Sequence, residues 1–134
     1  MRYRSTLTIP AGTQQVSPAT QAVPLTYGRI EQCVIMFPPG QAGLCHLKVL
    51  YHEKQIFPTS PEQDFIGDDS LIVFPDHFPV YDEPFEVYLV GWSPLTTLSH
   101  IVYVDFSVEA EEKPTITYSG SVALPTGVLR TKKA

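Results

Sequence analysis

The stretch Ile101-Val102-Tyr103-Val104-Asp105-Phe106-Ser107-Val108-Glu109 carries the clearest fold signal in this sequence. Apolar side chains stand at positions 102, 104, 106 and 108, and mainly polar ones fill the positions from 103 to 109 between them. Successive side chains of a β-strand point to opposite faces. The alternation therefore predicts a strand with one buried and one open face.

Similar patterns upstream predict further strands. Residues 85–90 and 45–52 alternate in the same way, and residues 29–37 are more evenly apolar, as in a strand that is covered on both faces. Shorter strands are expected at 3–9, 55–57, 71–74 and 115–118. Turns rich in proline and glycine, such as Pro38-Pro39-Gly40, and a long acidic loop at 58–69 separate these segments.

Seven or eight short strands joined by such turns predict an all-β protein. We expect a single antiparallel β-sandwich or jelly-roll-like domain with extended N- and C-terminal arms. The 134-residue length suits one domain, and 13 prolines with only 17% charged residues disfavour a helical protein. The expected core comprises Val34, Met36, Leu47, Val49, Phe85, Val87, Leu89, Val102, Val104 and Phe106.

The sequence shows no recognisable signal for membrane insertion or secretion. No apolar run reaches the length of a transmembrane helix. Residues 1–5 lack the apolar stretch of a signal peptide. We therefore expect no membrane partner and no secretion through a signal peptide.

Charge is divided between the middle of the chain and its ends. Residues 5–112 hold three basic side chains and all fourteen acidic ones, so this body carries a net charge of −11. An acidic body repels phosphate backbones, which predicts no nucleic-acid partner. The ends could dock on an acidic surface, or their lysines could simply solubilise a tail. Their basic residues are Arg2, Arg4, Lys113, Arg130, Lys132 and Lys133.

Two segments, 5–28 and 114–129, carry no charge but hold regularly placed Leu, Ile, Val and Tyr. Disordered tails usually carry more charge and fewer β-branched residues. We therefore expect an N-terminal strand and arm at 1–28, a sandwich body at 29–109 and a C-terminal arm with a basic tail at 110–134. Residues 3–9 are expected to join the body as an edge strand, and the rest of both arms to reach a neighbouring subunit.

No catalytic or metal-binding motif is evident, so the sequence predicts a non-enzymatic protein without a cofactor. Cys33 and Cys45 are interpreted as buried free thiols, with a disulfide as the alternative. His46 and His52 share one face of a predicted strand but lie roughly 20 Å apart along it, which is too far to share a metal. His77 and His100 are isolated.

The carboxylates of the loop at 58–69 could gather around Ca²⁺, which prefers oxygen ligands. Their spacing does not match a calcium-binding loop, so a solvated acidic loop is the preferred interpretation. The residues concerned are Glu62, Asp64, Asp68 and Asp69.

Tyr88, Trp92 and Tyr103 fall at the outward positions of their predicted strands. Exposed aromatic rings can stack on sugars, but they also dominate protein interfaces. Packing under an arm or a partner subunit is the preferred interpretation. A carbohydrate- or receptor-binding module, with these rings as the platform, remains the alternative function. A cupin-like enzyme would need a bound metal.

The combination of a β-sandwich, uncharged proline-rich arms and the turn Phe37-Pro38-Pro39-Gly40 resembles the small virion structural proteins of tailed bacteriophages. The resemblance is architectural and extends over the whole chain. It implies a head decoration (cement) protein, or an accessory head or tail protein. Such a protein is made in the host cytoplasm and incorporated into the virion.

The same resemblance implies a homo-oligomer, most often a trimer, that binds the major capsid protein or another virion protein. The residues expected at these interfaces are Arg2, Arg4, Tyr88, Trp92, Tyr118, Val122, Leu124, Arg130, Lys132 and Lys133.

Overall fold

The computed structural model describes residues 1–60 and 62–114, and it contains no helix in that part of the chain. Eight strands follow one another along the sequence. They are β1 (Arg2–Ile9), β2 (Ala19–Pro24), β3 (Gly28–Phe37), β4 (His46–Tyr51), β5 (Lys54–Phe57), β6 (Ser70–Val80), β7 (Glu86–Trp92) and β8 (His100–Ala110).

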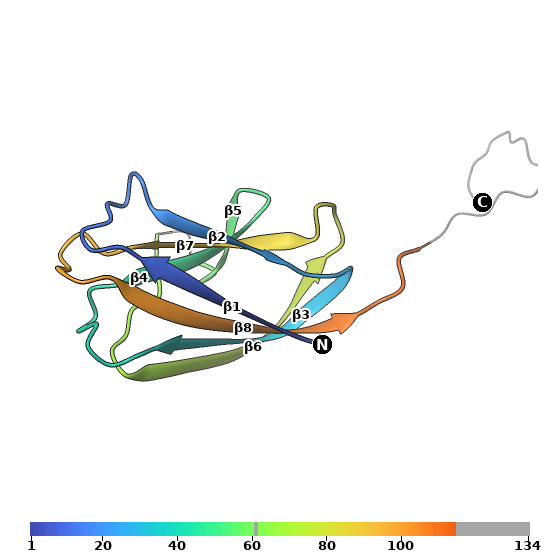
Figure 1. Cartoon of the computed structure of the whole chain (residues 1–134). Helices are drawn as coiled ribbons and strands as arrows, with labels where there is room; N and C mark the ends of the chain where they lie inside the picture. Colours follow the sequence, from blue (N-terminus) through green and yellow to red (C-terminus); the bar gives the residue numbers. More distant parts are fainter. Residues whose placement is uncertain (61, 115–134) are drawn as a thin grey trace, which may run out of the picture.

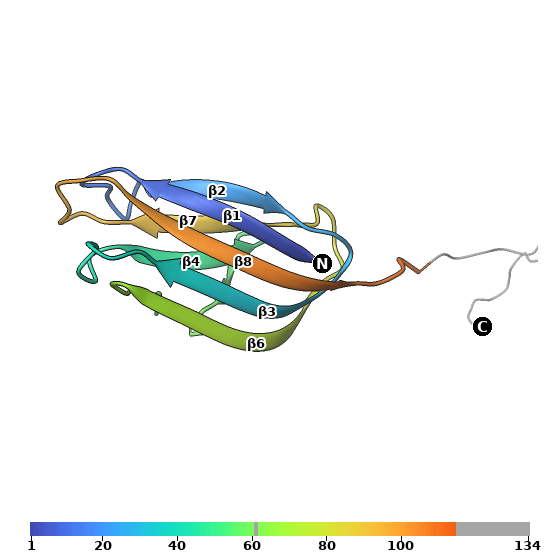
Figure 2. The same ribbon diagram turned by 60° about the horizontal axis from the view of Figure 1, so that its bottom comes forward.

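The strands form two four-stranded antiparallel sheets that pack face to face, as Figures 1 and 2 show. Sheet A has the order β1-β8-β3-β6, and sheet B has the order β2-β7-β4-β5. The pairing is nested, because β1 pairs with β8, β2 with β7, β3 with β6, and β4 with β5. The prediction of an all-β antiparallel sandwich is confirmed.

The core lies between the two sheets and receives alternate side chains from both. Seven of the expected core residues are fully buried. Phe85 is only partly buried and packs against the edge of the core. The confirmed residues are Leu47, Val49, Val87, Leu89, Val102, Val104 and Phe106.

The expected burial of Val34 and Met36 is wrong. Met36 is 42% exposed, whereas Cys33 and Ile35 on the same strand are fully buried. The cause is a register shift in β3 between Ile30 and Gln32. Such a bulge inserts one extra residue, and every later side chain of the strand then changes face.

Strand β6 is longer than expected, because it continues through Pro75 and Pro79. A proline has no N–H to donate, so prolines inside a sheet are confined to edge strands, where that position faces away from the ladder. Strand β6 lies at the edge of sheet A, next to β3. The edge position therefore allows the strand to run through both prolines.

The N-terminal segment belongs to the sandwich. Strand β1 pairs with β8 at the edge of sheet A, which confirms the edge strand expected at 3–9. The expectation that the rest of this segment reaches a neighbour is wrong for Ala19–Pro24, which forms β2 at the edge of sheet B. Val23 of this strand is buried in the core, whereas Thr20, Gln21 and Pro24 are exposed. Residues 115–134, which include most of the C-terminal arm expected at 110–134 and the strand expected at 115–118, lie outside the described residues.

Candidate functional site

Within residues 1–60 and 62–114, no group of three or more histidine, cysteine, aspartate or glutamate side chains is placed to hold a metal ion. In the same residues, no helix has the length and apolarity to cross a membrane. The acidic loop residue Asp68 has a structural partner instead. Its Oδ1 accepts hydrogen bonds from the backbone N–H groups of Gly40 and Gln41, at 2.8 and 3.0 Å. Backbone donors from Ala42, Gly40 and Gln41 hold the pKa of Asp68 below its usual value.

The histidines also pair locally. Nδ1 of His46 lies 3.3 Å from Oδ1 of Asp64, and Nδ1 of His77 lies 2.8 Å from Oε2 of Glu31. His52 begins the turn between β4 and β5, with Nε2 at 3.2 Å from the carbonyl oxygen of Asp82. These contacts lie in separate places on the surface.

Cys33 and Cys45 are free and buried. Burial raises the pKa of the Cys33 thiol to about 12, and the charges of Asp105 and Asp76 add to this effect. Burial also raises the pKa of Cys45. A thiol that stays protonated at neutral pH is a poor nucleophile, so both cysteines act as small apolar core residues.

The three aromatic residues expected on one surface are separated. Tyr88 and Trp92 belong to β7 in sheet B, whereas Tyr103 belongs to β8 in sheet A. Trp92 is only 5% exposed. Its ring stacks on His46 with 5.4 Å between ring centroids, and Nζ of Lys48 lies 5.5 Å from the Trp92 ring centroid. A platform of three exposed rings is therefore not formed.

Arg2 and Arg4, expected to contact a neighbour, both bind Asp105 of their own chain. Nη2 of Arg2 donates to Oδ2 at 2.9 Å. Nε and Nη2 of Arg4 donate to Oδ1 and Oδ2 at 2.9 and 3.1 Å. The Arg4 guanidinium, with a smaller contribution from Arg2, holds the pKa of Asp105 below its usual value. The two exposed arginines share one carboxylate, so this cluster keeps a net charge of +1.

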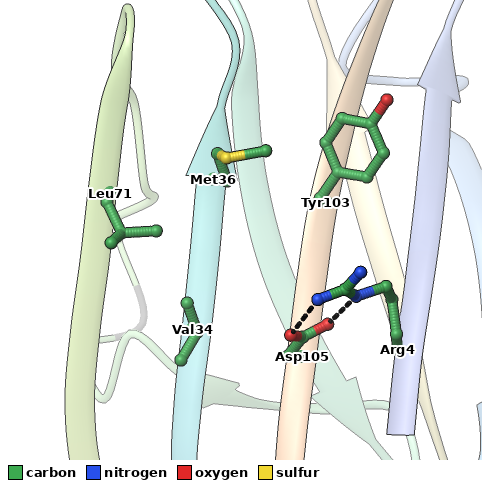
Figure 3. A pocket seen from close by; sticks show the side chains of 6 residues that line it. All are labelled: Arg4, Val34, Met36, Leu71, Tyr103 and Asp105. Carbon is green, nitrogen blue, oxygen red and sulfur yellow. Dashed lines mark hydrogen bonds and ion pairs between the residues drawn. The ribbon is translucent and has the colours of Figure 1, made fainter.

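An apolar patch lies beside this cluster on the outer face of sheet A. It consists of Met36, Leu71, Val73 and Ile101, which are 42, 64, 49 and 41% exposed. Met36 stands between Leu71 and Tyr103 across the strands, and Val34 stands between Val73 and Asp105. Figure 3 shows Leu71, Met36, Val34 and Tyr103 on neighbouring strands, with the Arg4–Asp105 pair at one side.

Two shallow hollows adjoin the apolar patch. One, of about 200 Å³, lies between Arg4, Tyr103 and Asp105 on one side and Val34, Met36 and Leu71 on the other. The second, of about 210 Å³, lies between Met36 and Leu71 and the segment from Phe37 to Pro39, and is bordered by Asp69. Met36 and Leu71 thus line both hollows; the Arg4–Asp105 ion pair also lines the first, and Asp69 lines the second.

The opposite end of the same face is charged. Arg29 lies 3.1 Å from Glu109, 2.8 Å from Glu111 and 3.9 Å from Glu31. These four groups carry a net charge of −2. The outer face of sheet A therefore has an apolar end and an acidic end.

Sequence reasoning missed most of the apolar patch. Ile101 was the outward residue at the start of a correctly predicted strand, and Leu71 and Val73 fell in a short segment that is apolar at every position. The available signal was Leu71-Ile72-Val73-Phe74 followed by Pro75, because a proline next to a strand indicates an edge, where two covered faces are not expected. Tyr118, Val122, Leu124, Arg130, Lys132 and Lys133 lie outside the described residues.

No protein-family model matches the chain, and a search of curated proteins found no match.

Proposed function

We propose that this chain is a non-enzymatic structural protein that works by symmetric self-association and by binding a larger protein lattice. The observation that carries the proposal is the apolar patch on the outer face of sheet A. An exposed cluster of large apolar side chains beside charged groups is typical of a protein interaction site.

The strand order supports a specific architecture for this role. Each pair of strands, from β1–β8 to β4–β5, is nested inside the previous one, and successive pairs alternate between sheet A and sheet B. We interpret this order as a jelly roll, in which a long folded hairpin wraps over two sheets. Jelly rolls occur in viral capsid proteins but also in lectins and cupins, so the fold alone does not assign the function.

The proposed setting is the virion of a tailed bacteriophage, as a decoration protein or an accessory head or tail protein. This rests on the architectural resemblance together with the apolar patch. In that setting the chain would be made in the host cytoplasm, would form a symmetric oligomer, for which the resemblance implies a trimer, and would contact the major capsid or another virion protein.

Sedimentation of the full chain tests self-association. We expect a discrete oligomer at micromolar concentration, and a chain ending at residue 114 should retain the β-rich circular dichroism spectrum while associating more weakly. The basic residues beyond 114 should make the association of the full chain weaker as salt rises. A full chain that sediments as a monomer at every concentration and salt would contradict the proposal.

A further inference from the structure

We infer that the open edge of the sandwich, between β5 and β6, is a binding site for a neutral saccharide. None of the residues that line this edge belongs to the apolar patch on the outer face of sheet A. The inference is therefore independent of the proposed self-association.

The two sides of the sandwich close differently. On one side, β1 lies directly against β2 (Figures 1 and 2). On the other side, the four residues of β5 stand beside the eleven of β6, and the ring of Phe57 bridges to the rings of Phe74 and Phe78. A cleft of about 640 Å³, called the edge cleft below, opens here. Small-molecule sites typically have volumes of roughly 300–1,000 Å³.

The floor of the edge cleft is apolar and aromatic. Tyr51 and Ile56 are each 9% exposed, and Phe78 is partly buried. The Tyr51 ring packs edge-on against the Phe78 ring, with 5.4 Å between the centroids. The C–H face of a sugar ring can pack on aromatic rings, because their faces carry partial negative charge.

Asp76 places a carboxylate on one wall of the edge cleft. The alternation of β6 puts it on the inward face with Phe74 and Phe78, and it is half-buried there. After burial and the charge of Asp105, the charge of Asp76 is the third cause of the raised pKa of Cys33, as expected of a carboxylate turned inward. Its Oδ1 accepts the backbone N–H of His77 at 2.6 Å. Residues 1–60 and 62–114 provide no ion-pair partner for it. The carboxylate therefore keeps acceptor capacity for a ligand.

Lys54 lies on the opposite wall. It pairs with Tyr51 in the β4–β5 register, and directly paired residues point to the same face, so Lys54 turns toward the edge cleft. Lys54 and Asp76 both line the cleft but do not form an ion pair with each other. An ammonium only donates hydrogen bonds and a carboxylate only accepts them. The cleft therefore offers a donor on one wall and an acceptor on the other.

Side-chain hydrogen bonds hold the rim of the edge cleft in place. The Tyr51 hydroxyl donates to the carbonyl oxygen of Asp82 at 2.7 Å and accepts the N–H of Asp82 at 3.1 Å. Nε2 of Gln55 lies 2.9, 3.0 and 3.0 Å from three carbonyl oxygens of the following loop, those of Pro58, Ser60 and Gln63. A rim that is already ordered loses less conformational entropy when a ligand binds.

The lining favours one class of ligand. Two carboxylates, those of Asp76 and Asp82, against the one ammonium of Lys54 disfavour a phosphate or another anion. A simple cation would satisfy the carboxylates but would be repelled by Lys54. A hydroxyl group both donates and accepts, so the neighbouring hydroxyls of a neutral sugar satisfy both walls together. The sugar ring also supplies the apolar face that fits the floor. A basic side chain of another polypeptide is the competing occupant that the test separates.

Amide chemical shifts of the full chain, measured by NMR, test the inference. The probes are the neutral methyl glycosides of glucose, galactose, mannose and N-acetylglucosamine, and Nα-acetyl-lysine amide stands in for a basic side chain. We expect at least one glycoside to shift amides of β5 and of the second half of β6, with a dissociation constant in the millimolar range. The lysine compound should not shift them.

Two variants and a matched control sharpen the test. Asp76→Asn removes the inward charge, and Lys54→Met removes the ammonium but keeps an aliphatic chain. Hydrogen bonds to charged groups are stronger than neutral ones, so each change should weaken glycoside binding about tenfold. Asp69→Asn is the control, because Asp69 lies just before β6 and outside the edge cleft. Its φ of 49° is one that asparagine tolerates, and binding should stay unchanged.

The outcomes separate this site from the proposed function. The inference would be overturned by the absence of shifts with every glycoside, by shifts away from the edge cleft, by no loss in Lys54→Met, or by equal losses in Asp76→Asn and Asp69→Asn. Binding of the lysine compound that only Asp76→Asn weakens would replace the saccharide with a basic polypeptide. A monomeric chain that binds a glycoside in the edge cleft would support the site and contradict self-association.

Discussion

Trp92 on the outer face of sheet B and Leu71 on the outer face of sheet A differ in how their neighbours cover them. Trp92 lies against His46 and under the amine of Lys48, and only 5% of it is exposed. Leu71 has Met36 as its cross-strand neighbour and is 64% exposed. Long polar side chains can lay their aliphatic parts over an apolar ring while their charged ends stay in water. Leu71 lacks that cover, because its cross-strand neighbour Met36 is apolar.

A residue on the inner face of sheet A should show the largest loss of stability when it is truncated. Phe106 is fully buried between the sheets. Phe106→Ala removes a buried ring and leaves a cavity, so we expect the free energy of unfolding to fall by about 3–5 kcal/mol. Urea unfolding followed by circular dichroism measures this. An unchanged midpoint would mean that the side-chain facing of β8 is wrong.

The two aromatic residues of β7 should behave differently. Trp92→Ala removes a ring that packs on His46, and we expect it to lower the free energy of unfolding by about 3 kcal/mol. Tyr88→Ala, on the same outer face but 40% exposed, should change it by no more than about 0.5 kcal/mol. Thermal unfolding of both variants is the measurement, and equal losses would contradict the different cover of the two rings.

The ion cluster beside the apolar patch should be visible in the pH dependence of stability. The folded state lowers the pKa of Asp105, chiefly through Arg4. The pair therefore stabilises the fold above the ordinary aspartate pKa of about 4, and this contribution is lost as pH falls through the lowered value. Asp105→Asn should cost at most about 1 kcal/mol at neutral pH, because solvent screens the exposed arginines.

Unfolding curves of Asp105→Asn and the wild type from neutral pH to below pH 4 check this expectation. The difference between the two proteins should shrink as the solution becomes more acidic. A difference that stays constant over this range would show that the charge of Asp105 is not what stabilises the fold.

The smallest effects are expected on the apolar patch. Met36→Ala and Leu71→Ala should change the unfolding free energy of the dilute monomer by no more than about 0.5 kcal/mol, because both side chains are largely in water. Denaturant titration at the lowest workable protein concentration checks this. A loss near that of Phe106→Ala would place Met36 in the core, as the sequence pattern alone predicts.

Much of the fold could be predicted because β-strands leave a period of two in the sequence. The alternation at 101–109 located β8 and its inward residues, since water penalises an apolar side chain on the wrong face. The same rule failed in β3. A strand that is apolar on both faces contains no signal for a one-residue bulge, and the bulge near Gln32 moved Met36 from the expected core to the surface.

The candidate site could not be assembled from sequence for a related reason. Its members come from β3, β6 and β8, and their contact depends on strand order, which is set by how the whole chain wraps. Arg4 and Asp105 are 101 residues apart in the chain, yet the β1–β8 register makes them direct partners. No local pattern in either segment indicates that register.

The sequence by itself therefore determined the all-β class, the positions of most strands and the facing of the strands with strict alternation, because these follow from local side-chain periodicity. The tertiary structure alone decided that Ala19–Pro24 joins sheet B and that β6 runs through two prolines. It also decided that Met36, Leu71, Val73 and Ile101 share an exposed face. These features depend on which strand lies at an edge and which lies beside it, and that is a property of long-range pairing.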